Sequence, residues 1–256
     1  MGFALTQKIV IVGATSSIAT HCGRLWAQGN VVDLHLLGRD GERLERLAAD
    51  LRARAAVGST VQIGVVEFLS GEAIQKTVVA LAAKGNIDIA LIAHGSLGDQ
   101  ADCQNDLAKN QAELEVNGVS PVLYAEAFAQ QMAKANHGTL CVIGSVAGDR
   151  GRRSNYVYGA AKGLVTRYVQ GLQHRFAGVK GNQVKVVLIK PGPTDTPMTA
   201  QLKAKGMKLA SVEDVAAGIV AAVAAGKPVA YVPGKWWLIM MVIRHLPSVI
   251  FNKMNI

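Results

Sequence analysis

The chain has few cysteines and no long hydrophobic run, and these shortages exclude several classes of protein. Only 3 of its 256 residues are cysteine, and Cys22, Cys103 and Cys141 lie far apart. This spacing predicts neither a disulfide framework nor a metal site, and it is typical of a reduced, cytoplasmic protein. No segment reaches the ~18 consecutive apolar residues that a membrane-spanning helix requires. The start, MGFALTQKIVIVGA, leads straight into a strand pattern, so we expect no signal peptide.

Acidic residues are scarce in the second half of the chain. Residues 1–149 carry 11 basic and 15 acidic side chains, whereas residues 150–256 carry 16 basic and 3 acidic ones. Between Arg150 and Lys190 there is no Asp or Glu. This asymmetry predicts an anionic partner, such as a phosphate group, an anionic lipid or nucleic acid, and subunit contacts are the alternative explanation. Because no nucleic-acid-binding motif accompanies the charge, we do not expect nucleic acid.

Half of the residues are hydrophobic, and the chain is long enough for one large α/β domain. Apolar segments typical of strands alternate with helical patterns such as 41–54 and 212–225. The expected strands are 8–12, 31–37, 61–68, 88–93, 139–143, 183–189 and 229–232. This alternation predicts a parallel sheet of about seven strands with helices on both faces, a doubly wound, three-layer Rossmann fold. We expect residues 1–234 to form this domain and residues 235–256 to be an apolar, basic extension of it.

Two turns predict a dinucleotide site. The first strand ends in Gly13-Ala14-Thr15-Ser16-Ser17-Ile18-Ala19. Small residues before a helix let the backbone approach a pyrophosphate, and the helix N-terminus supplies amide donors. The second strand ends in Gly38-Arg39-Asp40, where an arginine accommodates a 2′-phosphate. We therefore expect NADP(H) rather than NAD(H); the alternative is a surface arginine beside Asp40.

Tyr158 and Lys162 are the candidate catalytic pair. On a helix, residues four apart project from the same face. An ammonium group there favours the phenolate and lowers the tyrosine pKa from its usual ~10. Such a tyrosine exchanges a proton with an alcohol or carbonyl oxygen. The same spacing also occurs by chance on solvated helices.

Three further residues surround this pair in the predicted fold. A helix is expected over 111–135, and Pro121 within it cannot donate to the carbonyl of Asn117. We therefore expect a kink and a free carbonyl that binds another partner, such as water. Ser145 follows strand 139–143. His94, in the turn after the fourth strand, is more typical of a structural histidine than of a catalytic base.

The order of these features resembles the short-chain dehydrogenase/reductase family over residues 5–233. The resemblance implies the strand order 3-2-1-4-5-6-7. It makes Tyr158 the acid/base, Lys162 the group that lowers its pKa and holds the nicotinamide ribose, and Ser145 the partner of the substrate oxygen. Asn117 holds a relay water through its carbonyl. The implied cofactor-binding residues are Gly13, Thr15, Ser16, Ser17, Ile18, Arg39, Glu67, Phe68, Ala93, Gly95, Tyr158, Lys162, Pro191, Gly192, Thr194 and Thr196.

The sequence departs from the family pattern on the adenine side of the cofactor. Ser17 and Ala19 stand where glycines are usual, and Glu67 replaces an aspartate near the adenine. Ala93-His94-Gly95 replaces an asparagine-rich turn. The residues assigned to the chemistry keep the family pattern.

Residues 94–99, 147–159 and 240–251 resemble one group within the family, the reductases of polyprenyl-phosphate-linked keto-pentoses in cell-wall arabinose donor synthesis. This resemblance implies reduction of a 2-keto group by NADPH and a flavin-dependent oxidase as partner. Arg152 and Arg153 are then candidates for the substrate phosphate, with a solvated loop as the alternative. The family also implies a homo-oligomer.

Residues 235–256 combine a run of apolar residues, including Trp236 and Trp237, with basic residues and no acid. This composition favours a helix at the inner surface of the cell membrane, interrupted at Pro247. An apolar substrate lid and a subunit interface are the alternatives. Two other functions stay open: a soluble reductase or dehydrogenase of an unrelated small ketone, alcohol or 3-oxoacyl substrate, and a non-catalytic dinucleotide sensor.

Overall fold

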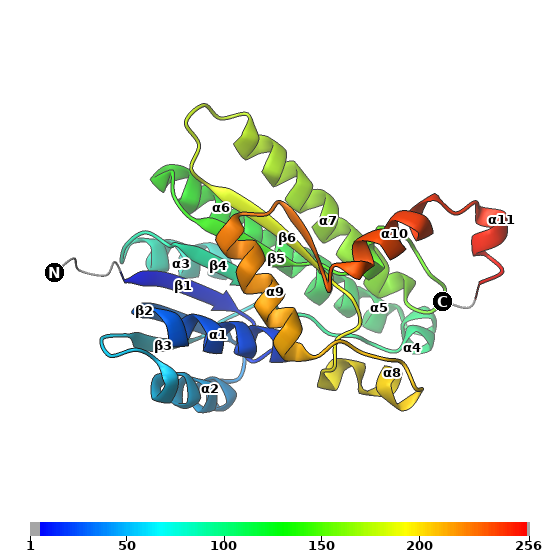
Figure 1. Cartoon of the computed structure of the whole chain (residues 1–256), viewed down its shortest axis with the longest axis horizontal. Helices are drawn as coiled ribbons and strands as arrows, with labels where there is room; N and C mark the ends of the chain where they lie inside the picture. The colour runs from blue at the N-terminus through cyan, green and yellow to red at the C-terminus, as the bar shows by residue number, and fades with distance from the viewer. Residues whose placement is uncertain (1–5, 255–256) are drawn as a thin grey trace.

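The computed structural model describes residues 6–254, which contain one sheet of seven parallel strands (Figure 1). The strands are β1 (Gln7–Val12), β2 (Val32–Gly38), β3 (Thr60–Val65), β4 (Ile89–Ile92), β5 (Thr139–Ile143), β6 (Lys185–Pro191) and β7 (Val229–Val232). Their order across the sheet is β3-β2-β1-β4-β5-β6-β7. The predicted Rossmann fold and strand order are confirmed. β3 ends earlier than expected, so Glu67 and Phe68 lie in the loop after it.

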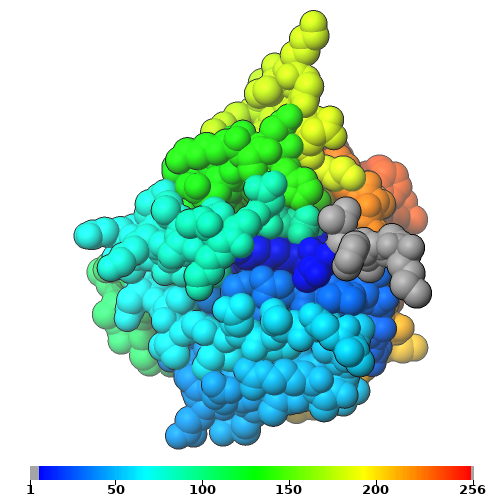
Figure 2. Space-filling model, turned by 90° about the vertical axis from the view of Figure 1, so that its left-hand side faces the viewer, coloured from blue at the N-terminus to red at the C-terminus, as the bar shows by residue number. Residues whose placement is uncertain are grey.

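Helices cover both faces of the sheet (Figure 1). One face packs against α1 (Ser17–Gly29), α2 (Gly41–Arg54) and α9 (Val212–Ala225). The other packs against α3 (Gly71–Ala82), α6 (Ser120–Ala135) and α7 (Tyr156–Ala177). Shorter helices, α4 (Gln100–Asn105), α5 (Leu107–Leu114) and α8 (Ala200–Ala204), lie in the connections. The loop between α7 and β6 projects from the body of the molecule, as Figure 2 shows from the side.

Strand β1 explains why the strands appear in the sequence as unbroken apolar runs. Ile9 and Ile11 belong to the core on the α1 side of the sheet, whereas Val10 and Val12 belong to the core on the α6 side. Alternate residues of a strand face opposite sides. A sheet that is covered on both faces therefore needs apolar residues at every position.

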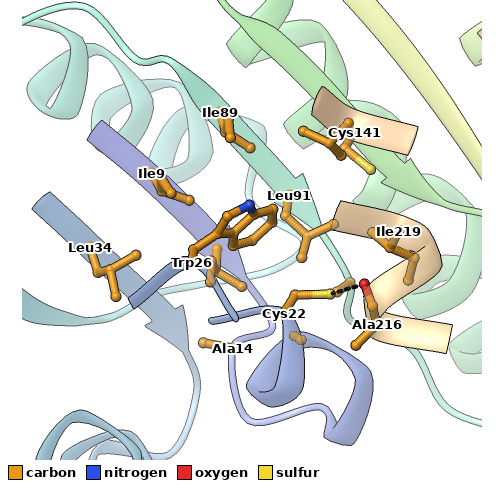
Figure 3. Packing of buried hydrophobic residues seen from close by; sticks show 14 of the residues in the cluster. Ile9, Ala14, Cys22, Trp26, Leu34, Ile89, Leu91, Cys141, Ala216 and Ile219 are labelled. Carbon is orange, nitrogen blue, oxygen red and sulfur yellow. Dashed lines mark hydrogen bonds between the residues drawn. The ribbon is translucent and has the colours of Figure 1, made fainter. Parts of the chain in front are cut away.

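The three cysteines behave as small hydrophobic residues. All three are free and buried. Figure 3 shows Cys22 packed beside Trp26, with its sulfur 3.9 Å from the carbonyl oxygen of Ala216. Burial raises the pKa of Cys22 to about 12 and also raises that of Cys141. These two thiols stay protonated at neutral pH and are not nucleophiles.

The helix expected over residues 111–135 is interrupted. α5 ends at Leu114, a π-helical turn follows over Glu115–Val119, and α6 begins at Ser120. The amide of Ser120 donates to the carbonyl of Glu115, five residues earlier. The next residue, Pro121, has no amide hydrogen, so the regular α-helical ladder cannot run through this point. The predicted irregularity is present, and it takes the form of a π turn.

The C-terminal extension forms two short helices, α10 (Lys235–His245) and α11 (Ser248–Phe251). Pro247 lies between them, as the sequence predicted. Most large apolar side chains of both helices are exposed, whereas Met240 is buried. Among residues 6–254, no helix is both long and apolar enough to cross a membrane.

Candidate active site

The residues selected from the sequence gather at one edge of the sheet. Each of these residues lies at or just after the carboxyl end of a strand. They are Gly13 after β1, Arg39 after β2, Ala93 after β4, Ser145 two residues after β5, and Pro191 as the last residue of β6. Because all strands run in the same direction, their carboxyl ends lie side by side although they are far apart in the sequence. Ligands of open α/β sheets bind in the crevice at this edge.

The turn after β1 is suited to binding a phosphate group. Gly13 has a φ of 75°, and a Cβ atom on it would lie 2.6 Å from the Cβ of His94, so the position requires glycine. Ser16 makes no capping hydrogen bond with its side chain, and the first turn of α1 has no acidic residue. The amides of Ser17 and Ile18 therefore remain available to an anion.

Arg39 is exposed at the end of β2, and its guanidinium lies 5.4 Å from the centre of the Phe68 ring. Asp40 caps α2, where its Oδ1 accepts a hydrogen bond from the amide of Arg43 at 3.0 Å. The side chain of Glu67 is exposed. The backbone carbonyl oxygen of Glu67 accepts a hydrogen bond at 2.8 Å from the hydroxyl of Tyr124, which is buried. Arg39 and Phe68 thus form one wall at the expected adenosine end of the crevice.

His94 is buried beneath this wall. Its ring centre lies 4.4 Å from that of Phe68, and its Nε2 pairs with Ser120 Oγ at 2.8 Å. Burial has the largest effect on its pKa, the nearby charges of Lys162 and Arg39 act in the same direction, and together they lower it to about 3. His94 is therefore neutral at physiological pH, which fits packing rather than proton transfer.

Tyr158, in the first turn of α7, lies beside Ser145. Ser145 Oγ accepts a hydrogen bond at 3.1 Å from the amide two residues later, and it also hydrogen-bonds the Tyr158 side chain. The 3₁₀ turn Val146–Asp149 packs directly on α7. A Cβ atom on Gly148 would lie 2.6 Å from the carbonyl carbon and oxygen of Lys162, so this close approach requires glycine. The packing fixes the two hydroxyl groups relative to each other.

Lys162 is buried one turn further along α7. Its Nζ donates to the carbonyl oxygen of Ile143 at 3.2 Å and lies 5.8 Å from the centre of the Tyr158 ring. An ammonium group has three donor hydrogens, and within residues 6–254 this carbonyl is its one hydrogen-bond acceptor. Burial lowers the pKa of Lys162 to about 8. A buried ammonium group with unused donors is suited to donate hydrogen bonds to the hydroxyl groups of a nucleotide ribose.

The prediction that Lys162 lowers the pKa of Tyr158 is wrong for this structure. Burial of the phenol has the largest effect and raises its pKa to about 12; the Glu113 carboxylate also raises it, and the Ser145 hydroxyl opposes the rise. The spacing of the two residues does not report the loss of water around the pair, and this loss disfavours the phenolate. Tyr158 therefore keeps its proton at neutral pH.

Asn117, in the π turn, joins α5 to the loop after β4. Its Oδ1 accepts a hydrogen bond from the amide of Ser96 at 2.9 Å, and its Nδ2 donates to Glu113 Oε2 at 2.8 Å. Ser96 Oγ donates to the other oxygen of Glu113, also at 2.8 Å. A Cβ atom on Gly95 would lie 2.8 Å from Asn117 Oδ1 and 3.7 Å from Lys162 Nζ. These contacts hold the side chains in one rigid group.

The arginine-rich loop after the 3₁₀ turn contacts the C-terminal extension. Arg150 donates to the carbonyl oxygens of Ile243 and Leu246, both at 2.6 Å, and its guanidinium lies 3.8 Å from the centre of the Phe251 ring. Arg152 is partly buried, and its Nε has no hydrogen-bond partner among the residues that the structure describes. Burial lowers its pKa. A partly buried guanidinium with an unused donor is suited to an anionic ligand.

The charge of Asp149 acts on Arg152 and raises its pKa, opposing the larger effect of burial, but the direct partners of Asp149 lie elsewhere. Asp149 forms a buried ion pair with Lys190 and accepts a hydrogen bond from the Tyr231 hydroxyl at 2.7 Å. Arg153, the second candidate for the substrate phosphate, is exposed. In this loop, the Nε donor of Arg152 is therefore the group that the structure leaves for an anionic ligand.

The segment after β6 lies against α10. A Cβ atom on Gly192 would lie 1.9 Å from Nε1 of Trp236, so the indole touches the backbone of this turn. Thr194 is buried and donates to the Gly192 carbonyl at 3.0 Å. The amide of Thr196 donates to Thr199 Oγ1 at 3.1 Å at the start of a 3₁₀ turn, Pro197–Thr199. Through Trp236, the C-terminal extension forms part of the wall of the site.

The family model described as short chain dehydrogenase matches residues 7–206. The chain belongs to this family. An uncharacterized oxidoreductase of Mycobacterium tuberculosis is 31% identical over 247 residues, which cover 96% of each chain. Another, from Streptomyces coelicolor, is 27% identical over 248 residues, covering 97% of this chain and 96% of the relative. As a member of the short-chain dehydrogenase family, the chain is an oxidoreductase acting on CH–OH or C=O groups.

Solved short-chain dehydrogenases share the fold. One from Mycobacterium ulcerans superimposes with a TM-score of 0.80 at 18% identity and covers 100% of both chains. Another, from Burkholderia cenocepacia in complex with NADP, gives a TM-score of 0.79 at 18% identity over 97% of both chains.

Two residues of this site, Glu113 and Trp236, were not among those selected from the sequence. Glu113 carried one signal in the sequence, its position four residues before Asn117 on the same helical face. The contact of Trp236 with Gly192 carried none, because it joins segments far apart in the chain.

Proposed function

We propose that this short-chain dehydrogenase is an NADPH-dependent ketone reductase in which Tyr158 protonates the carbonyl oxygen while Ser145 hydrogen-bonds it. The observation that carries the proposal is the hydrogen-bonded pair of these hydroxyls, with Tyr158 protonated at neutral pH. The bound nicotinamide cofactor supplies the hydride. Lys162 directs its unused donors to the nicotinamide ribose. The backbone carbonyl of Asn117 holds the water through which Tyr158 recovers a proton.

The remaining cofactor contacts follow from the turns at the edge of the sheet. Residues 13–18 bind the pyrophosphate at the N-terminus of α1, and residues 191–196 bind the nicotinamide end. Ala93 and Gly95 line the middle of the site, and Glu67 and Phe68 flank the adenine. Arg39 binds the 2′-phosphate, which favours NADPH over NADH.

Replacing Arg39 with Ala should lower the preference for NADPH over NADH by at least about tenfold, because a hydrogen bond to a charged group contributes ~1.5–3 kcal/mol. The measurement is kcat/KM for both cofactors with one ketone. Arg46→Ala, an exposed arginine of α2 paired with Glu42, is the matched control and should leave the ratio unchanged. An R39A enzyme that keeps the wild-type ratio contradicts the assignment.

For the substrate, we propose the 2-keto group of a polyprenyl-phosphate-linked pentose, by resemblance to decaprenylphosphoryl-2-keto-β-D-erythro-pentose reductase. The unused Nε donor of Arg152 and the positive loop around it support a phosphate contact next to Tyr158. In this proposal a flavin-dependent oxidase supplies the ketone, and the enzyme acts as a homo-oligomer in the cytoplasm, at the inner face of the membrane. The alternative is a reductase of a small soluble ketone.

The exposed apolar face of the C-terminal extension supports a lipid-bound substrate. Trp237 is 54% exposed and Leu238 56% exposed on α10, and Val249 is 73% exposed on α11. Lys235 and Arg244 flank this face, and residues 235–256 contain no acidic side chain. Apolar side chains edged by cations match an anionic lipid surface.

Replacing Trp237 and Leu238 with Ser should weaken sedimentation with phosphatidylglycerol vesicles at least tenfold, because each side chain contributes roughly 1.5–3 kcal/mol when it leaves water. The matched control replaces Val57 and Leu107, which are exposed elsewhere, with Ser. Turnover is tested with NADPH and a polyprenyl-phosphate keto-pentose made by a flavin-dependent oxidase. A wild-type enzyme that neither binds vesicles nor reduces this lipid favours the soluble-ketone alternative.

A further inference from the structure

Glu113 places a carboxylate in the active site that the proposed reaction does not use. Its two oxygens accept hydrogen bonds from Ser96 Oγ and Asn117 Nδ2, each at 2.8 Å. The loop after β4 passes over it at Gly98, where a Cβ atom would lie 3.0–3.1 Å from the carboxyl group and Cγ. Glu113 is thus held on three sides by residues of, or next to, the proposed machinery.

The charge of Glu113 is not neutralised by a basic side chain. Within residues 6–254, no Lys, Arg or His lies within salt-bridge distance of its carboxylate. The side chain is partly exposed, and its charge acts on Tyr158 in α7 and on Cys103 in α4. The two oxygens of a carboxylate accept about four hydrogen bonds. In the described part of the chain only two of these positions have a side-chain donor, so the other two can bind a ligand near Tyr158.

The position of Glu113 decides what kind of ligand group it takes. An uncompensated carboxylate repels phosphate and other anions and favours donors such as alcohols. Anions are instead attracted to Arg152, whose loop follows β5, whereas Glu113 contacts the loop after β4. A substrate that suits both contacts is a hydroxylated ketone with an anionic substituent.

We propose that Glu113 is a specificity-determining residue that accepts a hydrogen bond from a hydroxyl group next to the substrate ketone. The enzyme then selects α-hydroxyketones over ketones that lack this hydroxyl. This inference rests on the proposed reductase function and defines its substrate class. A site built to pair a substrate hydroxyl discriminates against the analogue without it, because the acceptor in the site then loses its partner.

The test compares acetoin with butanone, which differ only in the hydroxyl group next to the ketone. With NADPH, the wild-type enzyme should favour acetoin in kcat/KM, and Glu113→Gln should lower this preference about tenfold, since a charge-assisted hydrogen bond is replaced by a neutral one. The glutamine keeps the shape of the side chain. Glu115→Gln, two residues further on, is the matched control and should behave as wild type.

The kcat/KM values for acetoin and butanone are measured on the same preparation of each enzyme. Partial unfolding of a variant lowers both values equally and leaves their ratio unchanged. An E113Q enzyme that keeps the wild-type ratio would overturn the proposal, as would a wild-type enzyme that does not prefer acetoin. If the wild type reduces butanone and loses this activity when Tyr158 is replaced, either of these two outcomes refutes only the role of Glu113 and leaves the reductase function standing. A wild type that reduces no ketone contradicts the proposed reductase function and this inference with it.

Discussion

Replacing Tyr158 with Phe should lower kcat for ketone reduction by about a thousandfold. General acid catalysis by a positioned side chain contributes ~10²–10⁴-fold, and phenylalanine removes the only atom that carries the proton. The ring of Tyr158 stays in place, so the packing of α7 on the 3₁₀ turn is preserved. The dissociation constant for NADPH, measured by fluorescence, should change by less than about threefold.

Tyr156→Phe is the matched control. This tyrosine lies two residues earlier in the same turn of α7 and is 42% exposed. Its loss should leave turnover unchanged. Preserved reduction by the Tyr158→Phe enzyme would exclude Tyr158 as the acid, and a loss of NADPH affinity equal to the loss of kcat would assign it to cofactor binding instead.

Replacing Lys162 with Met should abolish most turnover and, at pH 7, make the protein more stable. Burial lowers the pKa of Lys162 from 10.5 to about 8, so the folded state holds a charge that it disfavours. Converted by linkage, this costs on the order of 3 kcal/mol at pH 7. Methionine occupies a similar volume without the charge. Loss of the ribose contact should raise KM for NADPH and lower kcat together.

The stability effect of Lys162 has a defined pH dependence. The unfolded chain binds more protons than the folded one between pH 8 and 10.5, so the stability of the wild type rises through this window. The advantage of Lys162→Met should be complete below pH 8 and gone near pH 10.5. Lys180→Met, in the exposed loop after α7, should show neither effect. Urea unfolding at pH 7 and pH 10 measures both, and a less stable K162M at pH 7 contradicts the account.

The fold was predictable because its signals are local. Helices Gly41–Arg54 and Val212–Ala225 and strand Thr139–Ile143 begin and end where the apolar pattern indicated. The helical spacing also placed Tyr158 and Lys162 together. Their protonation was not predictable from spacing, because it depends on how much water the surrounding segments exclude.

What the sequence missed arises from contacts between distant segments. Trp236 meets Gly192 only because α10 folds back on the end of β6. Glu113 acquires its place from the loop after β4, which supplies Ser96. The π turn at Asn117 was expected only as a kink, because Pro121 excludes a regular ladder without specifying its replacement.

The central claim is that hydride reaches a ketone carbon while Tyr158 protonates its oxygen. The most direct measurement follows deuterium from NADPH, labelled at the transferable position of the nicotinamide, into the alcohol product by mass spectrometry. The wild-type enzyme should give one deuterium on the new carbinol carbon, and Tyr158→Phe should give almost no labelled product in the same time. An alcohol that forms without the label, or that forms equally fast with phenylalanine at this position, would contradict the account.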